Sequence, residues 1–189
     1  ICTIAGLRIR RQQALSQQHI ASQIIRLHVI ANSDETADQT LKKEVKDQVV
    51  TYLRSKMNQA ASIQAARQVI CQEMDALKEI AEKKIRQEGY DYPVTVSLGT
   101  TYFPVKEYGD MAFPAGDYEA LRVQIGKSKG RNWWCVMYPS LCLVDGVYQT
   151  VPENSKDKLK QVLSTSEYQS LVDGGEDVQF RLRFLDWLF

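Results

Sequence analysis

The stretch IIRLHVIANSDE, residues 24–35, decides the fold because it predicts a strand that runs straight into a helix. Apolar and polar side chains alternate along its first part, as on a strand with two different faces. One face carries Ile25, Leu27, Val29 and Ala31, and the other carries Arg26 and His28. The residues Asn-Ser-Asp-Glu at 32–35 are typical of a helix N-terminus, where they cap the first turn and suit its positive end. We therefore expect the strand to end and the helix to begin within about three residues.

Two long helices are predicted after this strand. The first covers residues 34–58, and its apolar residues recur at helical spacing: Leu41, Val45, Val49, Tyr52 or Leu53, and Met57. Its other face is interpreted as solvated and carries Lys42, Lys43, Glu44, Lys46 and Asp47. The second helix covers residues 63–88 and should end at Gly89.

The rest of the chain alternates between strands and connections. Strands are predicted near 94–98, 118–125, 133–138 and 177–184, with a helix at 155–163 and a turn at 166–172. The segment 103–117 is predicted to be irregular, and 126–132 is predicted to be a mobile basic connection between two strands that form a hairpin. This order predicts an α+β fold, with a mostly antiparallel or mixed sheet and two long helices packed on one face.

Length and charge limit the function classes. The chain has 189 residues and a net charge of +1, from 24 basic and 23 acidic side chains. Such a balance gives no electrostatic basis for binding nucleic acid. Residues 1–23 are interpreted as a lead-in that carries either the remnant of a signal or anchor segment or a frayed end. Residues 24–189 are predicted to form a single domain.

The stretch WWCVMYPSLC, residues 133–142, holds the cysteines that form a unit. Pro139 turns the chain, so Cys135 and Cys142 can form a disulfide, which is our leading interpretation and points to an oxidising compartment. Two alternatives remain at this point: zinc bound by both cysteines and His28, or a Cys135 nucleophile with His28 as its base. Cys71 is predicted to be a part-buried free thiol.

The two tryptophans in this stretch are adjacent, so on a strand they face opposite sides of the sheet. One of Trp133 and Trp134 can enter the core, and the other either lies on a covered second face or serves as an aromatic anchor for a partner. Gly126-Lys127-Ser128 does not fit a phosphate-binding loop, because the required earlier glycine is Leu121 and a strand follows instead of a helix.

Three segments together resemble a known family. These are RLHVIANSD (26–34); Tyr108-Gly109-Asp110 followed by FPAGDYEALRV (113–123); and NWWCVMYP (132–139), with Leu141 and Cys142 beyond it. In this order they are similar to the stage II sporulation protein R family of endospore-forming bacteria. Ser140 departs from the second proline expected after Pro139.

The resemblance implies a signalling protein without cofactors, and not an enzyme. Members are made in the forespore and exported to the space between the two sporulation membranes. There they activate a membrane-embedded aspartic protease of the mother cell, which removes the pro-sequence of sporulation sigma factor E. The segment from Tyr108 to Pro114, the two tryptophans and the polar face of the first strand are our hypothesis for the contact surface. The residues concerned are Arg26, His28, Tyr108, Asp110, Pro114, Trp133 and Trp134.

Two other functions compete with this one. An extracytoplasmic cysteine-dependent hydrolase would use Cys135 and His28, and would require a free, acidic thiol beside an imidazole. A cell-wall or polysaccharide-binding module would require a row of exposed aromatic residues on one face, which the sequence supports only weakly.

Overall fold

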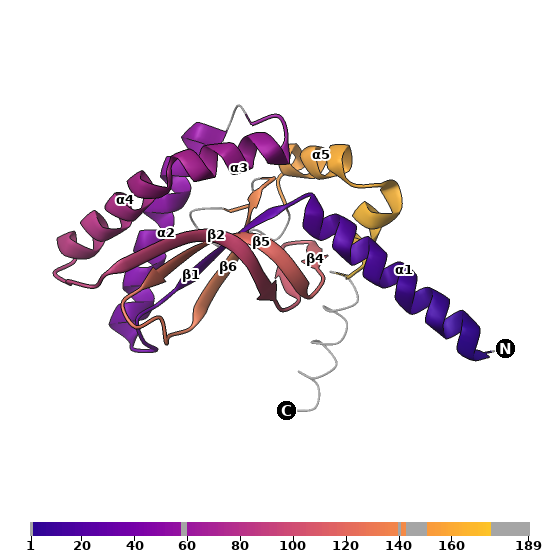
Figure 1. Cartoon of the computed structure of the whole chain (residues 1–189), viewed down its shortest axis with the longest axis horizontal. Coiled ribbons are helices and arrows are strands. Elements are labelled where there is room, and N and C mark those ends of the chain that lie inside the picture. The colour runs from indigo at the N-terminus through magenta and orange to yellow at the C-terminus, as the bar shows by residue number, and fades with distance from the viewer. Residues whose placement is uncertain (1, 58–59, 140, 143–150, 175–189) are drawn as a thin grey trace. The chain divides into compact units, whose positions relative to one another are not determined.

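We describe the computed structural model for residues 2–57, 60–139, 141–142 and 151–174 (Figure 1). The chain divides into two compact units. The sheet unit comprises residues 24–101 and 119–146, and the terminal unit comprises residues 1–23, 102–118 and 147–189. The predicted division into a lead-in over 1–23 and a single domain over 24–189 stays a prediction.

A four-stranded mixed sheet forms the centre of the sheet unit. Its strands are β1 (Ile25–Ile30), β2 (Val94–Phe103), β5 (Gly116–Ile125) and β6 (Asn132–Tyr138). They lie in the order β2-β5-β1-β6, so β1 is parallel to β5 on one side and antiparallel to β6 on the other. The α+β class is therefore confirmed. The predicted hairpin between 118–125 and 133–138 is wrong, because β1 lies between these two strands.

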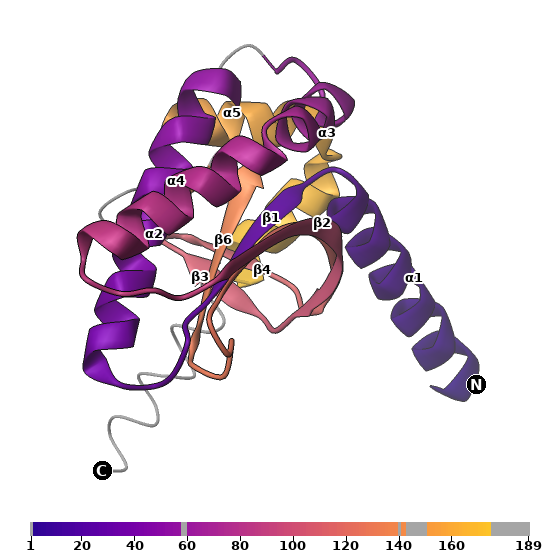
Figure 2. The same ribbon diagram turned by 60° about the vertical axis from the view of Figure 1, so that its left-hand side comes forward.

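Three helices lie on one face of this sheet (Figures 1 and 2). They are α2 (Thr36–Met57), α3 (Ile63–Gln72) and α4 (Met74–Gln87). The predicted apolar stripe of α2 is buried, from Leu41 to Met57. The second predicted helix is divided at Glu73, whose carboxylate accepts hydrogen bonds from Tyr52 and Lys56 of α2. Gly89 follows α4 with a φ of 82°, as its predicted role as a helix stop requires.

Buried polar groups fix the point where β1 passes into α2. Asp38 is 4% exposed and accepts hydrogen bonds from Asn32 Nδ2 at 2.8 Å and from Ser33 Oγ at 2.6 Å. The Ser33 hydroxyl also accepts the Glu35 N–H at 3.2 Å. The polar side chains predicted to start the helix therefore bond to one another and to Asp38 in its first turn.

The loop between β5 and β6 is fastened to this junction. Lys127 N donates to Asn32 Oδ1 at 2.9 Å, Gly130 N donates to the Ala31 carbonyl at 3.0 Å, and Arg131 N donates to Asp34 Oδ1 at 2.6 Å. These bonds correct the prediction of a mobile connection. The loop crosses the end of β1 and is anchored to the residues that leave it.

The terminal unit holds the other elements. They are α1 (Cys2–Ser22), the short strands β3 (Lys106–Tyr108) and β4 (Met111–Phe113), α5 (Glu153–Val162), and a helical segment at 165–174. β3 and β4 pair antiparallel across Gly109 and Asp110, so the segment predicted to be irregular contains a small hairpin. The lead-in predicted as loose or helical is helical in α1, and the turn predicted at 166–172 lies in a helix. The strand predicted at 177–184 lies outside the described residues.

Gly130→Ala tests the anchored loop. A methyl group at this position would overlap the carbonyl oxygen of Ser33, and backbone on both sides would have to move. We expect the free energy of unfolding to fall by about 1–3 kcal/mol in urea denaturation. Gly99→Ala is the matched control, because nothing lies within 4 Å of the added methyl. Equal stability of the two variants would contradict the anchored arrangement.

Candidate functional site

Strands β1 and β6 bring together the first-strand residues and the tryptophans predicted to contact a partner. His28 is directly opposite Trp134, and their rings stack with centroids 3.9 Å apart at an interplanar angle of 19°. His28 Nε2 also lies 2.9 Å from Asn132 Oδ1. Opposed residues of paired strands share a face of the sheet, so the stack belongs to the same face as Arg26.

This face is basic and aromatic. Arg26 is 0% exposed, His28 is 5% exposed, and half-buried Arg122 of β5 is opposite His28. Burial lowers the pKa of His28 below 6.5, the hydrogen bond to the Asn132 oxygen opposes this shift, and the positive charge of Arg122 adds to it. This environment therefore favours the neutral form of the imidazole beside the indole. Because Arg26 and His28 are buried, they do not themselves present a free surface, and the ring of His28 supports the ring of Trp134.

Trp133 faces the opposite side of the sheet, as the adjacent positions predicted. It is opposite Val29 of β1, and Lys46 Nζ of α2 lies 4.5 Å from the centre of its ring. Lys46 is 2% exposed and forms an ion pair with Asp47. A desolvated ammonium over an indole face is a favourable cation–π contact. Trp133 is therefore joined to the helix layer, whereas Trp134 lies on the other face.

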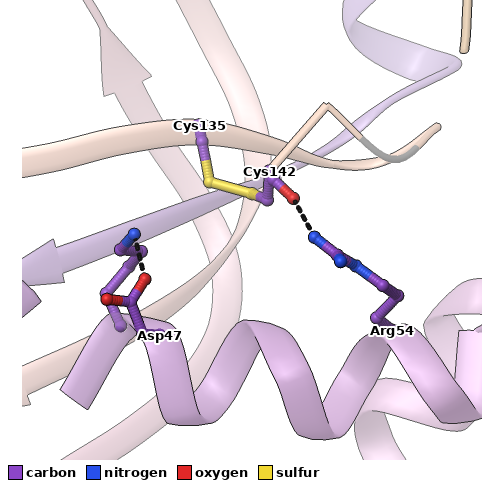
Figure 3. Close-up of a disulfide and its surroundings, with 5 residues drawn as sticks. Asp47, Arg54, Cys135 and Cys142 are labelled. Carbon is purple, nitrogen blue, oxygen red and sulfur yellow. Dashed lines mark hydrogen bonds and ion pairs between the residues drawn. A yellow bond between two sulfur atoms is a disulfide. The ribbon is translucent and has the colours of Figure 1, made fainter. Parts of the chain in front are cut away.

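The disulfide between Cys135 and Cys142 closes the chain beyond β6 (Figure 3). The two Cα atoms are 5.5 Å apart, and both cysteines are buried. Arg54 Nη2 of α2 donates to the Cys142 carbonyl at 3.2 Å, and Leu141 N donates to the Val136 carbonyl at 3.0 Å. The predicted disulfide is confirmed, and it is fastened to both the strand and the helix layer.

The same geometry argues against a Cys135–His28 catalytic pair. A sulfur in a disulfide is not a thiolate nucleophile. Cys135 is opposite Leu27, so its side chain leaves the sheet on the face away from His28. Within the described ranges, no three His, Cys, Asp or Glu side chains gather in a way that could hold a metal ion. Cys71 is free and exposed, not part-buried as predicted.

The other predicted contact residues lie in the terminal unit. The ring of Tyr108 packs edge-on against Phe113, with centroids 5.7 Å apart. Asp110 forms an ion pair with Lys156 at 2.7 Å and accepts the Val151 N–H at 2.8 Å. Burial opposes ionisation of Asp110, but these two partners hold its pKa below the usual value. The Pro114 carbonyl accepts the Tyr118 hydroxyl at 2.5 Å. The predicted residues therefore form two groups, one in each unit.

Comparison with known proteins identifies the family. The family model described as stage II sporulation protein R (spore_II_R) matches residues 21–148. The chain belongs to this family. It is 37% identical to stage II sporulation protein R of Bacillus subtilis (strain 168) over 139 residues, which cover 74% of this chain and 62% of that relative. No solved structure matches. The matched residues include the whole of the sheet unit, with the His28–Trp134 stack and the disulfide.

Other residues of this family member contribute to the site without having been predicted. Asn132 bonds to His28, Arg122 lies opposite His28, and Lys46 lies over the ring of Trp133. Lys42 and Lys46 were assigned to a solvated helix face, yet they are 4% and 2% exposed. Lys42 Nζ donates to the Arg131 carbonyl at 2.9 Å, and burial, aided by the charges of Arg131 and Lys43, lowers its pKa to about 8. The spacing of apolar residues along a helix cannot show whether another part of the chain packs over the polar side of that helix.

No helix among the described residues of this sporulation protein is both long and apolar enough to cross a membrane.

His28 should make stability depend on pH. The folded state disfavours the imidazolium, so between the folded pKa and 6.5 the unfolded chain binds more protons than the folded chain. Stability from the neutral imidazole is therefore fully present above pH 6.5 and is lost as the pH falls from that value through the lower folded pKa. His28→Phe keeps an aromatic ring on Trp134 but does not titrate. We expect the wild type to lose stability relative to this variant on acidification, measured by urea unfolding across that range. A difference that is constant with pH would contradict the assignment.

Removing the disulfide should destabilise the fold without abolishing it. In the loop-entropy model, a cross-link that closes so short a loop contributes about 2–3 kcal/mol. We expect the double variant Cys135→Ser, Cys142→Ser to lose about that much free energy of unfolding in chemical denaturation. Cys71→Ser, which changes an exposed free thiol, is the control and should match the wild type. A double variant as stable as the control would show that the cross-link does not stabilise the protein.

Proposed function

We propose that this protein is an intercellular sporulation signal. It is exported from the forespore into the space between the two sporulation membranes. There it activates the membrane-embedded aspartic protease of the mother cell, which removes the pro-sequence of sporulation sigma factor E. The observation that carries the proposal is membership of the stage II sporulation protein R family, by a match that includes the whole sheet unit.

The disulfide supports a location outside the cytoplasm. Cysteine pairs persist in oxidising compartments and are rare where thiols are kept reduced. Cys135 and Cys142 are 3% and 1% exposed, and the carbonyl of Cys142 is bonded to Arg54. The cross-link is therefore built into the packing of β6 against α2, as expected of a structural disulfide in an exported protein.

Activation by such a signal is a matter of binding. A ligand shifts its receptor toward the active state only by binding that state more tightly than the inactive one. The protein must then present a surface whose contacts exist only with the active protease. Binding energy at protein interfaces is concentrated in a few residues, and tryptophan and tyrosine are enriched among them.

Trp134 is the strongest candidate for such an anchor. It is half-buried, and its ring is held on one side by the stacked imidazole of His28. A ring that is fixed before binding loses little conformational freedom when the partner covers it. His28 then acts as a positioning residue beneath it. In the terminal unit, Tyr108, Asp110 and Pro114 are also half-buried and remain candidates for a second contact.

Processing of the sigma-factor precursor tests this proposal. Cells that carry the receptor protease and the precursor are compared with and without this protein. We expect processing to require the protein. Trp134→Ala should reduce processing roughly thirtyfold, as loss of an interface hot spot of about 2 kcal/mol would.

Two controls separate contact from folding. Trp134→Phe keeps an aromatic ring on His28 and should retain most of the activity, and Cys71→Ser should behave as the wild type. The accumulated amount and the unfolding midpoint of each variant are measured in parallel. Absence of processing in the presence of well-folded wild-type protein would refute the signalling function.

A further inference from the structure

Arg122 of β5 carries a guanidinium that the described part of the chain leaves without a partner. The side chain is half-buried, and it makes no hydrogen bond or ion pair with any other described residue. Its Nε–H is buried without a hydrogen-bond partner within the same ranges. An N–H that has left water without gaining a new acceptor is unfavourable. Within the described residues, this charge therefore has no stabilising role that explains its position.

The helix side of the sheet treats its charges differently. Glu119 lies three positions before Arg122 on the same strand, so it faces the opposite side of the sheet. It accepts two hydrogen bonds from the guanidinium of Arg67 of α3, each at 2.8 Å. Buried Lys46 likewise forms an ion pair with Asp47. Charges on the helix side are therefore paired within the chain, whereas the guanidinium of Arg122 is not paired among the described residues.

Arg122 belongs to the same face of the sheet as the Trp134 ring. It is opposite His28, whose imidazole stacks on the indole at 3.9 Å, and its positive charge lowers the pKa of that imidazole. A neutral imidazole cannot balance the charge of the guanidinium. The positions that the register of the three strands places on this face include no acidic residue. They are Arg26, His28 and Ile30 of β1; Ala120, Arg122 and Gln124 of β5; and Asn132, Trp134 and Val136 of β6.

We propose that Arg122 binds a carboxylate of the receptor, from an Asp or Glu side chain that reaches it when the receptor covers Trp134. This inference rests on the proposed function and adds the chemistry of the partner. A guanidinium is planar and can donate to both oxygens of one carboxylate. Because Nε is buried, the carboxylate approaches the Nη end of the group. Tryptophan and arginine are both enriched among the residues that carry binding energy at protein interfaces.

The rest of this face favours a protein carboxylate over the phosphates of a membrane surface. Attraction to anionic lipids depends on several accessible cations, each of which contributes only a modest amount. Of the two arginines on this face, Arg26 is 0% exposed, so Arg122 alone can reach a partner. Its neighbours Gln124 and Asn132 are uncharged. One guanidinium beside one indole ring therefore matches a single acidic side chain at a protein interface.

Arg122→Gln first shows whether the charge has a structural role. The urea unfolding midpoint should stay at or above that of the wild type, because no hydrogen bond or ion pair with a described residue is lost. The pKa of His28, followed by NMR, should rise, because a positive charge no longer opposes protonation of the imidazole. A lower unfolding midpoint would show that Arg122 stabilises the fold, and would overturn the proposal.

Precursor processing in cells that carry the receptor then tests the contact. Arg122→Gln should reduce processing about tenfold, as loss of a hydrogen bond between charged groups would. Lys129→Gln is the matched control, because it removes the same charge from an exposed position in the loop between β5 and β6, and it should retain full processing. Equal losses in the two variants would indicate a general effect of net charge and would overturn the specific contact. Full processing by Arg122→Gln would also overturn it.

A charge exchange identifies the source of the carboxylate. Arg122→Glu is combined with receptor variants in which each Asp or Glu facing the space between the membranes is changed, one at a time, to Lys. One receptor variant should restore processing with Arg122→Glu and impair processing with the wild-type signal. Failure of every variant to restore processing would overturn the proposal.

Two further outcomes separate this contact from its alternatives. Vesicles of phosphatidylglycerol and phosphatidylcholine are mixed with the full chain and sedimented. Binding by the wild type that Arg122→Gln abolishes would assign the guanidinium to lipid phosphates and overturn the proposal. Absence of processing with the unaltered signal and receptor would refute the signalling function itself, whereas a loss confined to the variants of Arg122 supports both.

Discussion

The pairing of β1 on both of its edges is the constraint on which the sheet unit depends. This six-residue strand is parallel to β5 and antiparallel to β6, so its backbone groups are satisfied from two directions and all its side chains are buried. The alternation of side chains along β1 also determines on which face of the sheet the opposed side chains of β5 and β6 lie. Val29 places Trp133 toward the helices, where Lys46 covers it, and His28 places Trp134 on the other face. A shift of one residue in this register would exchange the two tryptophans.

One junction holds this arrangement together. The chain leaves β1 through residues 31–34, and the loop from β5 to β6 crosses the same end of the strand. Hydrogen bonds from the backbone N–H groups of Lys127, Gly130 and Arg131 to that segment join the two connections. Asn32 and Ser33 also donate hydrogen bonds to the carboxylate of Asp38. Burial alone would raise the pKa of Asp38, but hydrogen bonds from Ser33, Asn32 and Tyr92 keep it below the usual value. The same polar residues therefore lie at the start of the helix and hold in place the loop that connects β5 to β6.

The two edges of the sheet differ in a way that bears on function. β6 carries buried residues, one cysteine of the disulfide and the aromatic residue that we assign to the receptor, and Arg54 of α2 donates to the carbonyl of the other cysteine. The β2 edge is uncharged and exposed, with a glycine at its centre.

Local patterns determined much of this protein. The strand at residues 24–31, the helix that follows it, the opposite facing of the tryptophans and the disulfide all depend on residues close in sequence. The period of the side chains and the short span between Cys135 and Cys142 are therefore enough to predict them. The family resemblance, carried by three separate segments, predicted the family itself.

Only the tertiary structure decided which strands are neighbours. The insertion of β1 between β5 and β6 joins residues about a hundred positions apart, and no local signal reports it. For the same reason, the sequence placed Lys42 and Lys46 in water, whereas a loop carbonyl and an indole ring cover them. Whether a charged side chain is buried depends on which other segment of the chain packs over it. The order of the strands decides which segment that is, and this order depends on contacts between residues far apart in sequence.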